Sequence, residues 1–84
     1  MKKIEHVVTS EQGIHAQIAV VLAQTAKKYS SRILLWKGDE SADMKNMIET
    51  VGLCVKQNTP IRIEITGEDE EGAAEELIRL IVSL

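Results

Sequence analysis

Residues 61–66, Ile-Arg-Ile-Glu-Ile-Thr, alternate strictly between apolar and polar side chains. Successive side chains of a β-strand point to opposite faces, so this segment predicts a strand with one buried and one solvated face. A sheet built from such strands is typically antiparallel and needs cover on one side only. The segment therefore restricts the fold to a sheet whose apolar face is covered by other elements.

Three further segments predict strands. In residues 2–8 the side chains of Ile4, His6 and Val8 share one face, which places His6 toward the core as a structural side chain. Residues 32–36 and 41–44 predict a hairpin around the turn residues 37–40, with Trp36 packing across it. We expect these strands to join residues 61–66 in one sheet.

Apolar residues at helical spacing predict three helices. The first runs from Ala16 to near Lys28, and the second is short, capped by Asn46 and ended by Gly52. The last opens in the acidic run 68–71, where carboxylates suit a helix N-terminus. The expected apolar stripes are Ala16, Ala19, Val20, Ala23 and Ala26 in the first helix, and Ala74, Leu77, Ile78 and Ile81 in the last.

The element order β-α-β-β-α-β-α, with strands apolar on one face, predicts an α+β open-faced sandwich. A chain of 84 residues predicts a single domain, residues 1–84, with a small core and a functional site on the surface. A net charge of −3 and only two aromatic residues argue against nucleic-acid binding. We also expect no membrane insertion, because no apolar run is long enough, and the single Cys54 fits a reducing, cytoplasmic setting.

The segment Gly13-Ile14-His15-Ala16 places an imidazole at the start of the first predicted helix. Backbone N–H groups there lack helical partners and carry the positive end of the helix dipole. An anion attached to His15 would be stabilised at this position. The residue alone leaves two interpretations open, an ordinary helix cap or a phosphoryl acceptor.

The sequence resembles the HPr phosphocarriers of the bacterial phosphoenolpyruvate-dependent sugar phosphotransferase system over its whole length. The resemblance rests on the element order, on Gly13-Ile14-His15-Ala16, on residues 21–29 and on Gly67-Glu68-Asp69-Glu70. It implies a four-stranded antiparallel sheet covered on one face by three helices (βαββαβα). It also implies a non-enzymatic carrier in which His15 takes phosphate on Nδ1 from enzyme I and passes it to enzyme IIA proteins, with no cofactor.

The sequence departs from the family at the residues that follow His15. HPr proteins usually continue with Arg-Pro-Ala, whereas this chain has Gln17-Ile18-Ala19. A neutral amide replaces a guanidinium, so about 1–3 kcal/mol of charge-assisted stabilisation is missing. Ile18 restores a backbone N–H that proline lacks, and the N–H groups of Ala16, Gln17 and Ile18 are candidates to stabilise the phosphate. We expect phosphotransfer at reduced efficiency.

Asn46 stands where members from Gram-positive bacteria carry a regulatory serine, so the resemblance implies that this switch is absent. It also implies a partner surface beside His15. The expected members of that surface are apolar or basic: Val20, Lys27, Lys45, Met47, Ile48 and Val51.

Two other functions remain open from sequence. A regulatory or protein-binding paralogue that has lost phosphotransfer explains Gln17, Ile18 and Asn46 more easily than a carrier does. A small-ligand-binding domain on a similar sandwich is the third candidate.

A metal site is not expected, because no His, Cys or carboxylate spacing completes a ligand set. The chain is expected to be a monomer.

Overall fold

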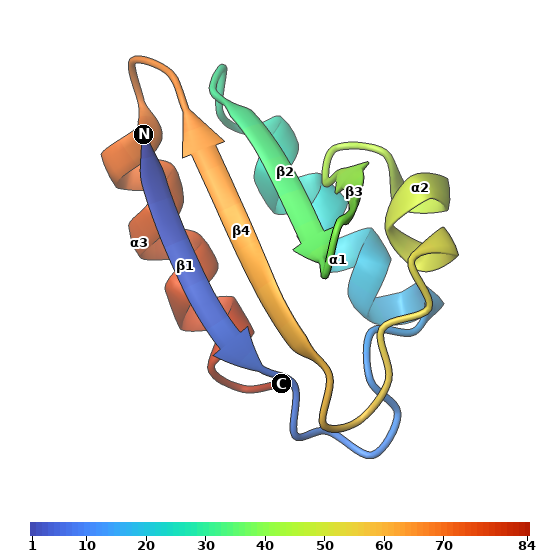
Figure 1. The fold of residues 1–84 in the computed structure, drawn as a ribbon. Coiled ribbons are helices and arrows are strands. Elements are labelled where there is room, and N and C mark those ends of the chain that lie inside the picture. Colours follow the sequence, from blue (N-terminus) through green and yellow to red (C-terminus); the bar gives the residue numbers. More distant parts are fainter.

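The computed structural model describes all 84 residues and contains seven elements in the order expected. Four strands form one antiparallel sheet in the order β1-β4-β2-β3 (Figure 1). The bounds are β1 Lys2–Val7, α1 Ala16–Lys27, β2 Arg32–Lys37, β3 Glu40–Asp43, α2 Met47–Gly52, β4 Pro60–Thr66 and α3 Glu70–Ile81.

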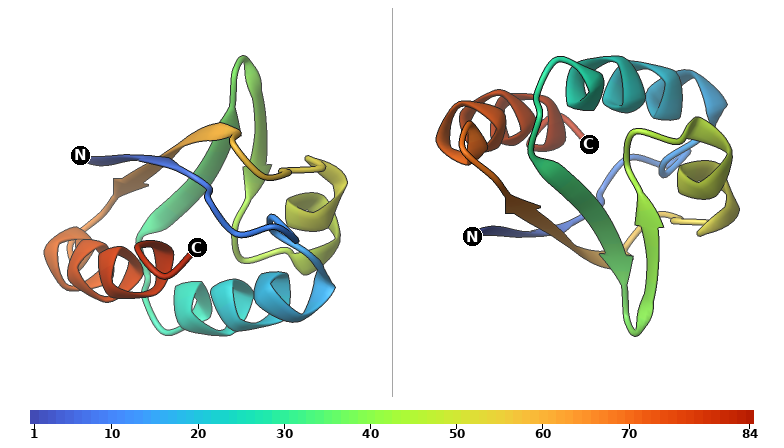
Figure 2. Two further views of the ribbon diagram at one scale, coloured as in Figure 1. Left: turned by 90° about the horizontal axis from the view of Figure 1, so that it is seen from below. Right: turned by 90° about the horizontal axis from the view of Figure 1, so that it is seen from above.

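Apolar and polar side chains alternate along β4, so they lie on opposite faces of the sheet. Ile61, Ile63 and Ile65 are buried, and α1 and α3 cover this face while α2 lies at the β3 side (Figures 1 and 2). Arg62 and Glu64 point to the opposite, uncovered face. The expected open-faced sandwich is confirmed.

The core lies between the sheet and the two long helices. Its largest fully buried side chains come from all layers and include Leu22, Ile33, Leu35, Met44, Ile63, Ile65, Leu77 and Ile81. Burial of this apolar surface is the main stabilising contribution in a domain of this size. Neither α1 nor α3, with 12 residues each, is long and apolar enough to cross a membrane.

The expected apolar stripes of the two long helices are partly wrong. The buried face of α1 consists of Ala19, Leu22, Ala23, Thr25 and Ala26, whereas Ala16 is exposed and Val20 is 37% exposed. In α3 the residue Ile78 is 43% exposed. Helix α1 packs against α2 and α3, and its buried residues coincide only in part with the predicted stripe.

His6 faces the core side of the sheet, as expected, but one of its ring nitrogens lacks a hydrogen-bond partner. It lies on edge strand β1 opposite Ile61, on the helix-covered face, and is half-buried. Its Nε2 is buried without a hydrogen-bond partner.

Helix α2 ends one residue later than expected. Gly52 is its last helical residue, and Cys54, rather than a glycine, takes the left-handed conformation with φ of 54°. Lys37 Nζ reaches this end of the helix from β2 and donates to the carbonyl of Leu53 at 2.8 Å. The cation offsets the negative end of the helix, and Cys54 is exposed rather than packed.

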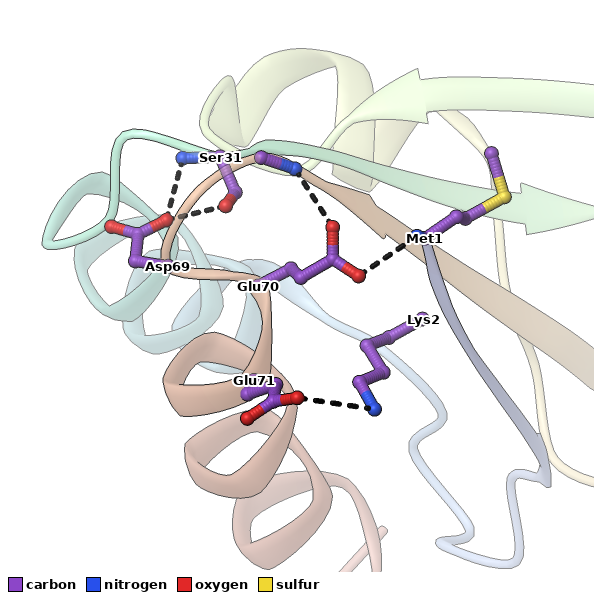
Figure 3. A network of polar contacts seen from close by, with 7 residues as sticks. Met1, Lys2, Ser31, Asp69, Glu70 and Glu71 are labelled. Carbon is purple, nitrogen blue, oxygen red and sulfur yellow. Dashed lines mark hydrogen bonds and ion pairs between the residues drawn. The ribbon is translucent and has the colours of Figure 1, made fainter.

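The acidic start of α3 is held by contacts to distant parts of the chain (Figure 3). Asp69 is the N-cap residue but makes no side-chain cap; its carboxylate accepts from the backbone N–H groups of Ser30 and Ser31 and from the Ser31 hydroxyl. These bonds, led by the Ser31 hydroxyl, lower the pKa of Asp69 to about 2. Glu70 contacts the Met1 amino group at 2.8 Å. The network ties α3 to β1 and to the segment before β2.

Candidate functional site

His15 is the N-cap residue of α1. Its backbone is extended, with φ of −92° and ψ of 179°, and the Gln17 N–H donates to His15 Nδ1 at 3.3 Å. In this contact Nδ1 is the acceptor, and a ring nitrogen that accepts a hydrogen bond does so through its lone pair. The lone pair of the half-exposed ring is directed at the first turn of the helix.

The first turn of α1 offers unused backbone donors next to that lone pair. Gln17 N–H contacts the imidazole, whereas the N–H groups of Ala16 and Ile18 make no intramolecular hydrogen bond. Ala16 and Gln17 are exposed, and the first turn carries no acidic residue. An anion attached to Nδ1 would meet these donors and the positive end of the helix dipole.

The loop before His15 is fixed against the segment between α2 and β4. Gly13 adopts φ of +62°, and Ile14 is buried and donates its N–H to the Val55 carbonyl at 2.9 Å. A Cβ added at Gly13 would lie 2.2 Å from that carbonyl oxygen and 2.8 Å from the Lys56 Cα. Only glycine permits both the left-handed conformation and this approach, so Gly13 helps to set the position of His15.

Lys56 is a residue near the site that the sequence did not indicate. Its backbone lies beside Gly13, its side chain is exposed, and it makes no ion pair. It comes from a segment 41 positions after His15, so no local pattern links the two. Gln17, in contrast, brings no charge to the first turn.

The expected partner surface is divided between the two ends of α1. Helix α2 runs antiparallel to α1. Lys45, just before α2, donates through Nζ to the carbonyl of Tyr29, just after α1. At the other end, the carbonyl of Val55, after α2, accepts from the loop before α1. With about 1.5 Å per residue, the 12 residues of α1 separate its ends by about 18 Å. Lys27 and Lys45 therefore lie at the end away from His15.

The apolar members of that surface differ in exposure. Ile48 is 77% exposed, Met47 38% and Val20 37%, whereas Val51 is half-buried against the core. These residues belong to α1 and α2, which pack side by side (Figure 1). Lys27 is exposed and unpaired, but the Lys45 ammonium is already bonded to Tyr29.

Asn46 caps α2 as expected. Its Oδ1 accepts from the N–H groups of Ile48 and Glu49 at 3.0 and 3.2 Å. Glu49 returns the contact by accepting from Asn46 Nδ2, and it also accepts from the Asp43 N–H at 3.1 Å. A carboxylate thus already occupies the N-terminus of α2.

A polar cluster around Glu76 holds the C-terminal end of α1 to α3. The Tyr29 hydroxyl and the Lys28 ammonium donate to the two carboxylate oxygens of Glu76, each at 2.5 Å. The Lys28 contact, followed by the Tyr29 contact, lowers the pKa of Glu76, and the bond to Glu76 raises the pKa of Tyr29. This cluster is about one helix length from His15.

No group of three or more His, Cys, Asp or Glu side chains is placed to hold a metal ion. The site around His15 consists of one imidazole and the backbone donors of the first turn of α1.

Comparison with known proteins shows the family of this chain. Residues 2–83 match the family model described as the PTS HPr component phosphorylation site. The chain is 34% identical to the phosphocarrier protein HPr of Haemophilus influenzae over 77 residues, covering 92% of this chain and 91% of the relative.

Two solved structures show the same fold. The histidine-containing phosphocarrier protein of a mycoplasma superposes with a TM-score of 0.94 at 27% identity, covering 98% of this chain and 93% of that chain. Crh, a catabolite repression protein of Bacillus subtilis whose crystal structure is a dimer with a swapped domain, gives 0.78 at 25% identity, covering 99% and 95%. The match to the family model over nearly the whole chain, with a histidine at the start of α1, shows that this protein belongs to the HPr family of phosphocarrier proteins of the phosphotransferase system.

Proposed function

We propose that His15 accepts a phosphoryl group from enzyme I on Nδ1 and passes it to enzyme IIA proteins. The bond from Gln17 N–H to Nδ1 carries this proposal, because it keeps a lone pair on that nitrogen. In the transfer, this lone pair forms the new P–N bond while the bond from phosphorus to the donor breaks, and Nε2 keeps its hydrogen. The chain is a carrier that is regenerated when the group leaves.

Transfer through His15 is slower than in a carrier with arginine after the histidine. The first turn supplies backbone N–H groups at Ala16, Gln17 and Ile18, which stabilise the phosphate by hydrogen bonds and the helix dipole. It supplies no cation, and a missing charge-assisted bond of about 1–3 kcal/mol corresponds to roughly a five- to 150-fold slower step. Lys56, the unpaired cation in the adjacent segment, recovers part of this loss.

The test is phosphorylation by enzyme I with labelled phosphoenolpyruvate. Gln17→Arg is expected to accelerate the appearance of acid-labile phosphate, and His15→Ala to abolish it. Gln24→Arg is the matched control, because Gln24 is an exposed glutamine of the same helix two turns further from the site. Equal rates for Gln17→Arg and Gln24→Arg would reject the electrostatic explanation, and label retained in His15→Ala would reject the acceptor.

The exposed apolar side chains of Val20, Met47 and Ile48, together with Val51, form the surface that meets enzyme I and enzyme IIA proteins. Methionine adapts to partners of different shape. Lys27 contributes a free cation at the far end of this surface, whereas Lys45 acts mainly by holding Tyr29. Ile48→Asp should weaken binding to enzyme I, and unchanged affinity would argue against this surface.

Asn46 makes the chain unresponsive to a kinase that modifies a serine at this position. It keeps the cap of α2 but has no hydroxyl to phosphorylate. Acid-stable phosphate on α2 after kinase treatment would contradict this.

We also expect a monomer, and a dimer in sedimentation at micromolar concentration would contradict that expectation.

A regulatory role without phosphotransfer is the second candidate. It is favoured by Gln17 in the first turn of α1 and by the likeness to a catabolite repression protein. Under this alternative, a partner binds the wild type and His15→Ala equally well. Loss of enzyme I–dependent labelling together with intact partner binding would select it over the carrier.

A further inference from the structure

The uncovered face of the sheet has a hollow at the end of the β2–β3 hairpin. This face points away from α1 and α3, and the hairpin tip rises above it (Figure 2). The hollow has a volume of about 640 Å³ and lies between Gly38 at the tip and Val7 at the end of β1. Gly38 follows Trp36 by two positions, so the place next to the indole has no side chain to fill it. We call this hollow the Trp36 groove; its other lining residues are Glu5, His6, Pro60, Ile61 and Arg62.

Two residues of the Trp36 groove carry buried hydrogen-bond donors without an acceptor. These are Trp36 Nε1 and Arg62 Nε, and the Arg62 guanidinium lies 5.1 Å from the centre of the indole ring. Arg62 Nε is 3.3 Å from a Glu64 oxygen, which forms an ion pair but not a hydrogen bond. Both groups can only donate, and a buried donor without a partner is costly.

The third unpartnered buried side-chain nitrogen is Nε2 of His6, a residue that also lines the hollow but whose side chain lies on the helix-covered face. The unsatisfied donors of the uncovered face are therefore gathered in one place. Because the Arg62 side chain is 37% exposed, its guanidinium can turn to meet a group in the groove. No residue of the groove accepts a hydrogen bond from Trp36 Nε1 or Arg62 Nε.

The charges of the groove indicate the kind of molecule that fits. Glu5 and Arg62 are direct cross-strand partners, yet Glu5 makes no ion pair. The lining thus holds one unpaired carboxylate and one guanidinium, which is itself ion-paired with Glu64 outside the groove. A matching occupant is uncharged, has an acceptor beside a donor, and offers a flat face to Trp36. A carboxylate ligand would meet Glu5 as well as Arg62, and a cation would meet Arg62 as well as Glu5, so the lining favours an uncharged ligand over either.

We propose that the Trp36 groove binds a small, uncharged planar ring that contains a cyclic amide, the chemistry of a nucleobase. The ring stacks beside Trp36, its carbonyl accepts from Arg62 Nε and Trp36 Nε1, and its N–H donates to Glu5. The interaction is non-covalent. It is separate from phosphotransfer, because His15 lies at the start of α1 in the helix layer.

The experiment uses the fluorescence of Trp36, which is the only tryptophan of the chain. Uracil and hypoxanthine are titrated into the wild type, with free tryptophan amide as the correction for absorbance. We expect saturable quenching by both rings and none by benzoate or by dimethyluracil, which lacks the N–H donor. Uridine and inosine added in parallel distinguish a site for the free base from one for the nucleoside.

Arg62→Gln tests the donor and should weaken binding by about tenfold or more, the loss expected for one charge-assisted hydrogen bond. Arg32→Gln is the matched control, because Arg32 is an exposed arginine of β2 outside the groove, and it should leave affinity unchanged. Glu5→Gln, measured by backbone amide shifts, provides a second variant should Arg62→Gln fail to fold. The proposal is overturned by an absence of saturable quenching and amide shifts, by equal binding of dimethyluracil, or by equal effects of the two arginine variants.

Discussion

Gly13 and Gly38 form a matched pair that separates backbone strain from steric contact. Both adopt a left-handed conformation, with φ of +62° and +60°. A Cβ at Gly38 would meet nothing within 4 Å, whereas a Cβ at Gly13 would lie 2.2 Å from the Val55 carbonyl oxygen. Alanine at either position therefore incurs the same conformational cost, and only Gly13→Ala forces the loop away from Val55.

The expected magnitudes follow from these contacts. The left-handed conformation costs about 1–2 kcal/mol for alanine at either position. Relieving the close contact at Gly13 requires a backbone shift of roughly 1 Å and adds about 1–3 kcal/mol, the usual range for overpacking. Since a domain of 84 residues has roughly 4–13 kcal/mol of stability in total, Gly13→Ala removes a large fraction of it.

The assay is urea unfolding followed by far-ultraviolet circular dichroism, combined with the rate of labelling by enzyme I. Gly38→Ala should be the milder variant and should be labelled at the wild-type rate. Gly13→Ala should be less stable and labelled more slowly even where it is fully folded, because the loop that positions His15 has moved. Equal free energies of unfolding for the two variants, or unchanged labelling of Gly13→Ala, would refute this reasoning.

Substitutions at three further positions test the polar contacts. Folding lowers the pKa of Asp69 from 3.8 to about 2, so its contribution to stability is complete above pH 3.8 and is lost as the pH falls toward 2. Asp69→Asn should therefore flatten the pH dependence of the urea midpoint in this window. An unchanged slope would contradict this contribution. Asn46→Ala should cost about 1 kcal/mol while Asn46→Ser costs much less, and equal melting of both would contradict the cap. Lys37→Met should remove about 1 kcal/mol with the bond to Leu53 and speed amide exchange in α2; unchanged exchange would count against that bond.

The fold was predictable where the pattern is local. Alternation in residues 61–66 predicted β4, and Asn46 predicted the start of α2, because both signals lie within a few residues of the structure they produce. The ends of elements were harder, since they depend on distant partners. Lys37 binds the end of α2 beyond Gly52, and Asp69 bonds to Ser31 rather than to its own helix.

The candidate site shows the same division. The position of His15 at the start of α1 was predictable, because an N-cap is a local feature. The contact of Gly13 with Val55 was not predictable, and neither was the proximity of Lys56. Both join segments about 40 positions apart in the sequence. The placement of Lys45 against Tyr29 likewise depends on the packing of α2 along α1.

The most direct test of the central claim is the identity of the nitrogen that carries the phosphoryl group. The protein, labelled with nitrogen-15 in histidine, is phosphorylated by enzyme I and phosphoenolpyruvate, and the ring nitrogens are observed by proton–nitrogen correlation spectra with phosphorus coupling. We predict a coupling at Nδ1 of His15, with Nε2 keeping its hydrogen and His6 unchanged. Coupling at Nε2, phosphate on His6, or no phosphohistidine would contradict the account.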